Sequence, residues 1–244
     1  LYATSDAELC EDCCESPEDI EAYEAEREKN RALWERKAQS DPDALENVVV
    51  RAIIGDRELH KSQRVVLSSL RAGNSVLAVM ATGRGKSLTF QVHAACEALA
   101  HHTASLFVYP LRALIADQAF HINEALAPFG INACTLTGES APDERRQVFA
   151  GLRDGSVDIV LTTPEFLVCH APEFAATDRI GFVVVDEAHH IGLSRAGHRP
   201  AYAQLGSAIT QMGNPVVLAL TATSDEAVTS DIDRVLPVAG HVVD

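Results

Sequence analysis

Two short segments of the chain carry side chains that could do chemistry. The first is ATGRGKS at residues 81–87, directly after an apolar run at residues 75–80. An apolar strand that ends at a glycine-bracketed loop, followed by a helix that begins with Lys-Ser, is typical of a phosphate-binding loop. Backbone N–H groups and the helix N-terminus face the anion in such a loop, Lys86 can reach terminal phosphates, and the Ser87 hydroxyl can hold Mg²⁺.

The loop departs from the strict pattern at one position. That pattern has a glycine five residues before Gly85, and Met80 stands there in this chain. A glycine-rich turn that ends in Lys-Ser by chance is therefore an alternative to nucleotide binding. The rest of the chain has to decide between the two.

The second segment is DEAH at residues 186–189, which follows the apolar run at residues 182–185. Asp186 could hold Mg²⁺ directly or through water, and Glu187 could position and deprotonate an attacking water. The alternative is an ordinary strand-to-helix turn with Asp as its N-cap. Because the acidic pair follows a second apolar strand downstream of a phosphate loop, nucleotide hydrolysis is favoured.

Two further places have side chains suited to a nucleotide site. The apolar run at residues 216–220 continues into Thr221 and, one residue later, Thr223, whose hydroxyls could instead cap the next helix. Gln63 stands at the start of the helix that leads into the first strand. Its amide has both a donor and an acceptor, so it could read an adenine edge.

Alternating strands and helices have to position these side chains. From residue 62 onward, strands are expected at residues 75–80, 105–109, 132–136, 158–162, 182–185 and 216–220. Helices are expected at residues 63–70, 86–100, 111–127, 143–152, 165–170, 199–212 and 224–235. Such alternation predicts an α/β fold with a mainly parallel sheet, in which ligands lie beyond the carboxyl ends of the strands.

The first part of the chain has a different composition. Residues 1–46 hold 15 Asp and Glu against 5 Lys and Arg, whereas residues 47–244 hold 20 against 15. A helix that begins after Ser16 has a thin apolar face, so we expect it to lie on another surface. The chain therefore divides into an acidic helical extension or linker, residues 1–45, and a nucleotide-binding lobe, residues 46–244. A solvated charged face is favoured over a specific binding site for the extension.

Charge and hydropathy exclude several classes of protein. The net charge of −15 argues against non-specific nucleic-acid binding by the whole surface, although a local basic groove is compatible with it. No apolar run approaches the roughly 18 residues that span a bilayer, and the N-terminus has no signal pattern. We therefore expect a cytoplasmic, intracellular protein without a membrane partner. Because the chain begins with Leu1, we also expect a piece of a longer protein.

The six cysteines do not indicate a disulfide framework in a chain of this size. Cys10, Cys13 and Cys14 include the Cys-x-x-Cys spacing of metal ligands, but no second pair follows. Reduced thiols are therefore favoured over a zinc site.

The motifs taken together resemble those of a known family. ATGRGKSLTFQ, YPLRALIADQ, TTPE, DEAH, HRPAY and LTATS occur here in the order and approximate spacing of superfamily 2 helicases. Over about residues 59–236 they look most like the first RecA-like lobe of RecQ-type DNA helicases. The resemblance implies a RecA-like P-loop NTPase domain and an ATP-dependent helicase that couples ATP hydrolysis to single-strand translocation and unwinding. It implies ATP and Mg²⁺ as cofactors.

The resemblance also implies a role for each matched residue. The catalytic residues would be Lys86, Asp186 and Glu187, with Ser87 and Asp186 as Mg²⁺ ligands. The ATP-binding residues would be Gln63, Thr82, Gly83, Arg84, Gly85, Lys86 and Ser87. Coupling between ATP and nucleic acid would involve His189, Thr221 and Thr223. The nucleic-acid path would include Pro110, Leu111, Arg112, Thr163, Pro164, Glu165, His198 and Arg199.

The implied partners are DNA, single-stranded or partly duplex, and a second RecA-like lobe of the same longer chain. That second lobe supplies the arginine finger in helicases of this superfamily. Two other functions stay open. The chain could belong to an RNA-directed or non-unwinding translocase, or it could be a non-catalytic nucleic-acid interaction module.

The nucleotide motifs depart from the family pattern at three places. Ala81 and Arg84 stand where the family usually has a proline and the middle one of three glycines. Arg84 adds a cation beside the phosphates. The Phe-Arg-Pro that usually precedes the adenine-reading glutamine is missing before Gln63. Phosphate binding is therefore better supported than adenine selectivity.

The segment after DEAH departs further. RecQ-like enzymes carry an aromatic-rich loop there that senses single-stranded DNA, and Ser194 and His198 replace its Trp and Phe. The Arg199-Pro200 and Tyr202 positions are kept. Since stacking of a base on an aromatic ring contributes about 1–3 kcal/mol, we expect coupling that is weaker or that uses His198 and Tyr202.

Overall fold

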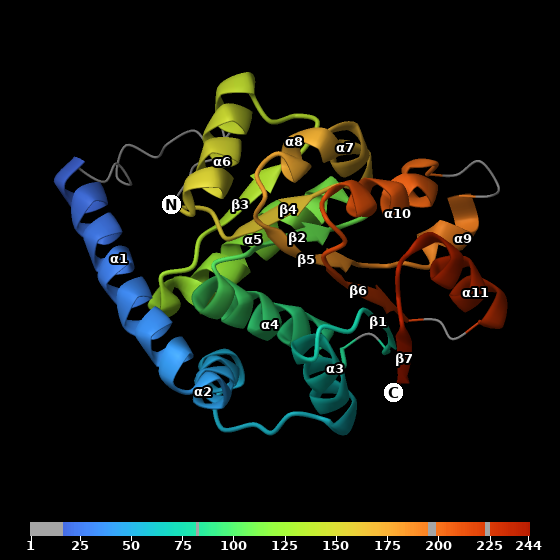
Figure 1. Cartoon of the computed structure of the whole chain (residues 1–244), viewed down its shortest axis with the longest axis horizontal. Coiled ribbons are helices and arrows are strands. Elements are labelled where there is room, and N and C mark those ends of the chain that lie inside the picture. The colour runs from blue at the N-terminus through green and yellow to red at the C-terminus, as the bar shows by residue number, and fades with distance from the viewer. Residues whose placement is uncertain (1–16, 82, 195–198, 223–224) are drawn as a thin grey trace.

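The computed structural model describes residues 17–81, 83–194, 199–222 and 225–244. Within these residues seven strands form one sheet, in the order β3-β4-β2-β5-β6-β1-β7, and every neighbouring pair is parallel (Figure 1). The strands are β1 (Val76–Val79), β2 (Ala104–Val108), β3 (Ala133–Leu136), β4 (Ile159–Thr162), β5 (Ile180–Val185), β6 (Val216–Thr221) and β7 (Gly240–Val243). The predicted α/β class, parallel sheet and six strands are confirmed, with small shifts at the strand ends.

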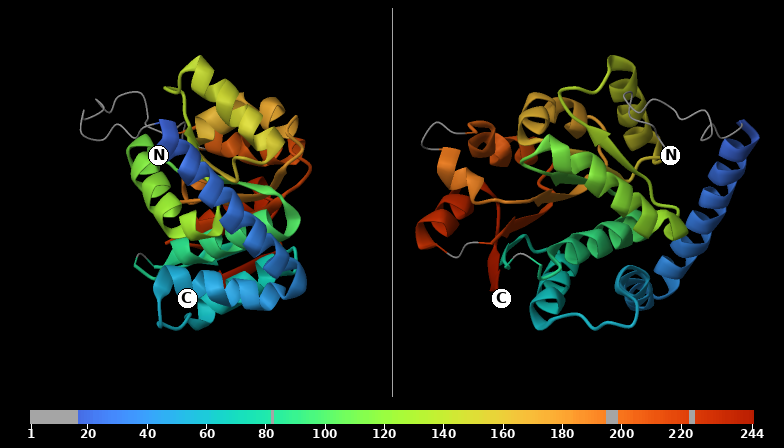
Figure 2. Two further views of the ribbon diagram at one scale, coloured as in Figure 1. Left: turned by 90° about the vertical axis from the view of Figure 1, so that its left-hand side faces the viewer. Right: turned by 180° about the vertical axis from the view of Figure 1, so that it is seen from behind.

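Helices cover both faces of the sheet (Figures 1 and 2). One face is covered by α2 (Pro42–Ile54), α3 (Lys61–Arg71), α4 (Lys86–His101) and α5 (Arg112–Leu126), with the short 3₁₀ helix η2 (Ala127–Phe129) after α5. The other face is covered by α6 (Pro142–Asp154), α7 (Pro164–Cys169), α8 (Ala171–Ala175), α9 (His190–Ser194), α10 (Ala201–Gln211) and α11 (Glu226–Val235). In the part of the chain that the structure describes, no helix has the length and apolar character that crossing a bilayer requires.

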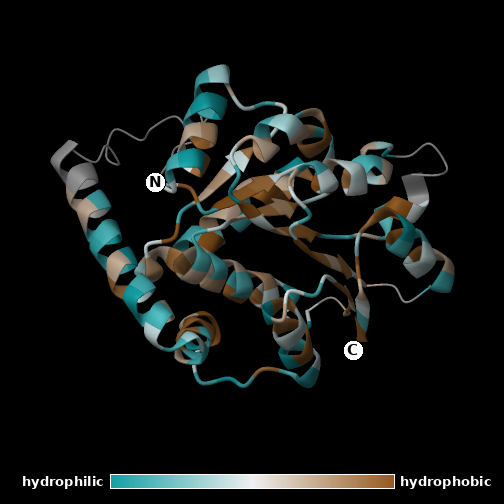
Figure 3. Ribbon diagram, in the orientation of Figure 1, coloured by the Kyte–Doolittle hydropathy of each residue, from teal (hydrophilic) through white to brown (hydrophobic). Residues whose placement is uncertain are grey.

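The apolar runs became strands because both of their faces are buried. Successive residues of a strand point to opposite faces. In β5, Phe182 and Val184 accordingly join the core under α4, while Val183 and Val185 join the core on the other face. The hydrophobic colour in Figure 3 is concentrated on these central strands. Burial on both faces fixes the strands, and their parallel direction brings the carboxyl ends to one edge.

One strand was missed from the sequence. β7 lies at the edge of the sheet, pairs with β1 only among the described strands, and is largely exposed. Its four residues, Gly-His-Val-Val, do not form the continuous apolar run that predicts a buried strand. A strand that is exposed does not need the apolar residues that burial on both faces requires.

The long helix α1 (Pro17–Ser40) lies along one side of the molecule and contacts α2, α4 and η2 (Figures 1 and 2). Trp34 donates from its indole N–H to the Pro128 carbonyl at 3.1 Å, and its ring lies 5.1 Å from that of Phe129. A side chain on Gly130 would collide with α1, because an added Cβ would lie 2.5 Å from the Arg27 carbonyl oxygen. The expectation that this helix lies on another surface is confirmed. The division of the chain at residue 45 stays a prediction.

A buried ion pair fastens α1 to the lobe. Arg31 Nη1 lies 2.8 Å from both carboxylate oxygens of Asp158, and the Asp158 side chain is completely buried. Asp158 also accepts the Asn132 backbone N–H at 3.0 Å. Since an unpaired charge in an apolar interior is strongly unfavourable, the Asp158 carboxylate depends on Arg31.

We predict that Arg31→Met lowers the free energy of unfolding by about 3–5 kcal/mol, because it leaves Asp158 buried without a cation. Arg36→Met is the matched control on the same helix. Arg36 is exposed and donates to the Ala32 carbonyl of its own helix, so its loss should cost no more than about 0.5 kcal/mol. Denaturant unfolding of both variants measures the difference, and equal stabilities would contradict the prediction.

Candidate nucleotide and nucleic-acid site

The phosphate-loop candidate joins the carboxyl end of β1 to the first turn of α4. Gly83 has a φ of +79° and Gly85 has a φ of +68°, a region that glycine enters without the steric cost of a side chain. Gly85 is the residue that caps α4, so the helix begins at Lys86 and its free N–H groups open toward the loop. Thr82 lies outside the described residues. The loop therefore has the layout of an anion site at a helix N-terminus.

Gln63 braces this loop from the start of α3. Its side chain is buried, and its amide nitrogen donates to the carbonyls of Arg84 at 3.2 Å and Gly85 at 3.0 Å. The amide oxygen accepts the backbone N–H of His60 at 2.8 Å. Both amide hydrogens are therefore engaged by the loop in this structure. The adenine contact expected of Gln63 stays a prediction.

Arg84 points along the loop toward β7. Its Nε lies 3.4 Å from a carboxylate oxygen of Asp244, and about half of its side chain is exposed. The backbone N–H of Asp244 donates to the Val79 carbonyl at 3.0 Å, which holds this acid beside the end of β1. The cation beside the phosphate loop thus has a carboxylate partner. Its expected contact with ATP stays a prediction.

Four strand ends, those of β1, β2, β5 and β6, are joined by backbone hydrogen bonds at this edge of the sheet. The N–H of Met80 donates to the Thr221 carbonyl at 2.9 Å, and that of Ala188 donates to the Leu220 carbonyl at 2.7 Å. The N–H of Asp186 donates to the Val108 carbonyl at 3.0 Å. The structure therefore brings the phosphate loop, the acidic pair and Thr221 together, as the sequence predicted. Thr223 lies outside the described residues.

The acidic pair has an unusual local geometry. Glu187 has a φ of +48°, which is rare for a residue with a side chain and is often found at functional sites. Its backbone N–H donates to the Asp186 carboxylate at 3.0 Å. Burial is the main cause that raises the pKa of Asp186, with a smaller contribution from the Glu187 charge, while the positive charge of Lys86 acts in the opposite direction. A cation beside Asp186 would therefore favour its ionised form.

The side chains here fit Mg²⁺. Asp186 and Ser87 offer the hard oxygen ligands that this ion prefers, and Mg²⁺ is usually bound by one or two protein oxygens, phosphates and waters. Among the residues that the structure describes, no group of three His, Cys, Asp or Glu side chains forms a metal site of the protein alone. Cys10, Cys13 and Cys14 fall outside that part of the chain.

The predicted nucleic-acid residues lie at the ends of two neighbouring strands, β2 and β4. Leu111 and Arg112 are exposed after β2, and the Arg112 guanidinium forms an ion pair with Glu139. After β4, Thr163 caps α7 by accepting the Phe166 N–H at 3.2 Å. Pro164 and Glu165 form the first turn of that helix, with Pro164 buried and Glu165 exposed.

Arg199 connects this region to the segment after DEAH. Its Nη1 donates to the carbonyl of Pro110 at 2.5 Å, across 89 residues of sequence. Arg199 also has a positive φ, +51°. His198 lies outside the described residues. The structure therefore brings Pro110 and Arg199 together. The sequence did not predict this contact.

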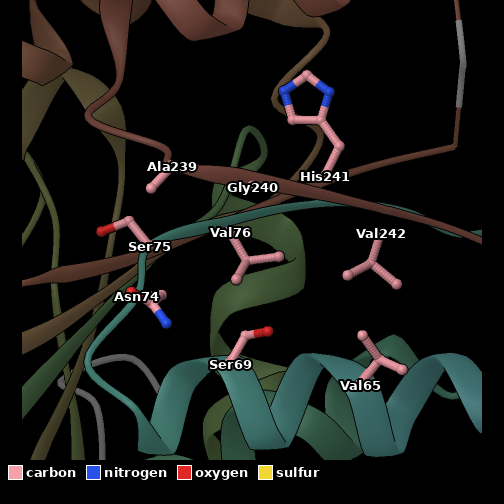
Figure 4. Close-up of a pocket in the computed structure, with 9 residues that line it drawn as sticks. All are labelled: Val65, Ser69, Asn74, Ser75, Val76, Ala239, Gly240, His241 and Val242. Carbon is pink, nitrogen blue, oxygen red and sulfur yellow. The ribbon is translucent and has the colours of Figure 1, made fainter.

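A pocket of about 350 Å³ lies elsewhere, between α3 and β7 (Figure 4). Val65 and Val242 point toward one another across it, and Asn74 and Ser75 lie at its other end. Asn74 and Ser75 lie at the amino end of β1, and Val242 pairs in register with Ala78 farther along that strand, whereas the phosphate loop follows its carboxyl end. None of the described residues of the loop or of DEAH lines the pocket.

Comparison with known proteins agrees with this geometry. The family model described as DEAD/DEAH box helicase matches residues 60–231. The chain is 33% identical to the ATP-dependent DNA helicase RecQ of Haemophilus influenzae, over 79% of this chain and 30% of that protein. It is 35% identical to the RecQ helicase of Pasteurella multocida, over 76% of this chain and 28% of that protein. The chain therefore spans about three tenths of the length of these relatives.

Solved structures show the same fold. The DUF1998 helicase MrfA bound to DNA superposes with a TM-score of 0.66 and 22% identity, over 80% of this chain and 29% of the other. At that identity the likeness concerns the fold, and it confirms the predicted RecA-like architecture. The RecQ-like resemblance drawn from the motifs is also confirmed. Since the family model covers most of the chain, the chain belongs to the DEAD/DEAH box helicase family.

Proposed function

We propose that this chain is the ATP-binding motor lobe of a RecQ-like, ATP-dependent DNA helicase, which couples ATP hydrolysis to single-strand translocation and unwinding. The observation that carries the proposal is the joining of the ends of β1, β5 and β6 by hydrogen bonds, which places Lys86, Asp186 and Thr221 at one edge. The names of the relatives, ATP-dependent DNA helicases, support the same activity.

The chain's own residues suit each part of the hydrolysis. The loop N–H groups and Lys86 hold the phosphates, and Ser87 and Asp186 would hold Mg²⁺. The bound Mg²⁺ would neutralise charge on the phosphates. Glu187 orients a water and accepts its proton as the water oxygen bonds to the terminal phosphorus. The bond from that phosphorus to the bridging oxygen breaks, and ADP leaves with the electron pair.

The proposal includes two partners and a location. Single-stranded or partly duplex DNA would lie along the ends of β2 and β4, where Leu111 and Arg112 are exposed. A second RecA-like lobe of a longer chain would close over the ATP and supply an arginine finger. The second lobe is supported by the fact that the chain spans only about three tenths of the relatives' length.

A cytoplasmic, intracellular location is part of the proposal, because the motor has to meet DNA and ATP.

We predict that Glu187→Gln in the full-length protein lowers kcat for ATP by about 10²–10⁴-fold, because the amide cannot accept the proton of the attacking water. The Kd for ATP should change little, since Glu187 is not among the residues proposed to hold the phosphates. Glu173→Gln on α8 is the control, since this acid is half-exposed and pairs with His170. Unchanged ATP hydrolysis in Glu187→Gln would favour a non-catalytic interaction module instead.

We predict that residues 1–244 alone, the lobe with its extension, hydrolyse ATP about 10³–10⁵-fold more slowly than the full-length protein, because they lack the proposed arginine finger. Steady-state ATP hydrolysis with single-stranded DNA and with RNA measures both the rate and the preferred nucleic acid. Robust DNA-stimulated hydrolysis by the lobe alone would contradict the proposal of a second lobe. Stimulation by RNA alone would favour an RNA-directed translocase.

We predict that Gly85→Ala weakens ATP binding about tenfold more than Gly83→Ala, a difference of about 1.4 kcal/mol. Both variants force alanine into a left-handed backbone conformation, at a cost of about 1–2 kcal/mol. An added Cβ at Gly85 would also lie 2.7 Å from Gln63 Nε2, whereas the one at Gly83 meets open space. Titration with ATP measures both affinities.

A second substitution separates the two effects on Gly85. Gly85→Ala should weaken ATP binding less in the Gln63→Ala background than in the unsubstituted background, because the collision is already removed there while the backbone strain remains. Equal losses in the two glycine variants would show that Gln63 does not hold the loop in its binding conformation.

A further inference from the structure

A series of three rings begins at the acidic pair. Nδ1 of His189 lies 3.1 Å from a carboxylate oxygen of Glu187. The ring of His190 lies 4.4 Å from that of His189, at an interplanar angle of 37°. The His190 ring also lies 5.4 Å from that of Tyr202, at an interplanar angle of 48°. His190 thus lies next to both His189, beside Glu187, and Tyr202, in the first turn of α10.

The far end of this series is tied to the predicted nucleic-acid path. The backbone N–H of Tyr202 donates to the Arg199 carbonyl at 3.1 Å, so the two residues share one turn. The Arg199 guanidinium donates to the carbonyl of Pro110, and the next residue, Leu111, is half-exposed. A strand that binds at the end of β2 would therefore meet a backbone segment that Arg199 holds.

Tyr202 is fixed in position by burial. Its side chain is fully buried, and its hydroxyl has no hydrogen-bond partner within the described part of the chain. Burial is the main cause that raises the pKa of this hydroxyl, while the Arg199 charge acts in the opposite direction. A ring held so tightly passes a displacement to its neighbours, because close-packed interiors transmit small shifts.

Both ends of this series have uncommon backbone conformations. Glu187 and Arg199 have φ values of +48° and +51°. Conformations of this kind are unfavourable for a residue with a side chain and persist where the surroundings hold them. The Asp186 carboxylate, which accepts the Glu187 N–H, and the Pro110 carbonyl, which accepts the Arg199 guanidinium, are such surroundings.

We propose that His190 is a positioning residue that transmits the occupancy of the nucleic-acid path to Glu187. The inference rests on the proposed function and names a residue that couples its two sites. A strand at Pro110 shifts Arg199 and Tyr202, the His190 ring follows Tyr202, and His189 follows His190 beside the Glu187 carboxylate. This route requires no aromatic side chain at residues 194–198, where the family pattern has Trp and Phe.

The test measures ATP hydrolysis by the full-length protein with and without a single-stranded DNA oligonucleotide. His190→Ala should lower the ratio of stimulated to unstimulated rate at least fivefold. His190→Phe, which keeps a ring between His189 and Tyr202, should restore this ratio to within twofold of the unsubstituted protein. His101→Ala is the matched control, because His101 is exposed at the opposite end of α4, and the ratio should not change.

A second readout separates positioning from binding. The Kd for the oligonucleotide, measured by fluorescence anisotropy, should agree within twofold between His190→Ala and the unsubstituted protein. His190→Gln, which has a polar side chain without a ring, replaces the alanine variant if thermal melting shows that variant to be unfolded, and it should lose the stimulation in the same way.

The outcomes distinguish the inference from the function on which it rests. If the unsubstituted protein is stimulated by DNA and the alanine or glutamine variant is stimulated equally, the role of His190 is overturned and the proposed function stands. If His190→Phe fails to restore the ratio, the role of the ring is overturned. If the unsubstituted protein shows no stimulation, the proposed function is overturned, and this inference with it.

Discussion

The site depends on one constraint, the parallel direction of all seven described strands. Because the strands run the same way, their carboxyl ends meet at one edge and their loops emerge side by side. Buried backbone N–H and C=O groups have to be paired. The hydrogen bonds from Met80 to Thr221 and from Ala188 to Leu220 therefore fix which residues of the neighbouring strand ends lie opposite one another. A shift of one strand by one residue would separate the phosphate loop from the acidic pair.

The opposite side of the lobe is held by a different interaction. The Arg31–Asp158 pair and the contacts of Trp34 fasten α1 near the amino end of β4, away from the nucleotide site. Most of α1 is hydrophilic (Figure 3). Arg31 and Trp34 nevertheless face the lobe and bind to it. The acidic composition of the extension is thus compatible with a helix that is packed against the lobe along part of its length.

Three arginine side chains at the candidate site each have a partner within the chain. Arg84 pairs with Asp244, Arg112 pairs with Glu139, and Arg199 binds a backbone carbonyl. These cations beside the loop and the strand ends therefore already have partners in a chain whose net charge is −15. Under the proposed function, a DNA strand would compete with those partners or use backbone donors and exposed apolar side chains such as Leu111.

The sequence by itself determined the fold class, six of the seven described strands and the positions of the motifs. Buried parallel strands require continuous apolar runs, and phosphate loops require glycine at positive φ, so both leave a local record. Edge strand β7 left none, because it is largely exposed and needs no continuous apolar run. Only the tertiary structure decided the partners of Gln63, the direction of Arg84 and the pairing of Arg31 with Asp158, 127 residues away. Such contacts depend on where the folded backbone brings two side chains together, and residue type alone does not encode that distance.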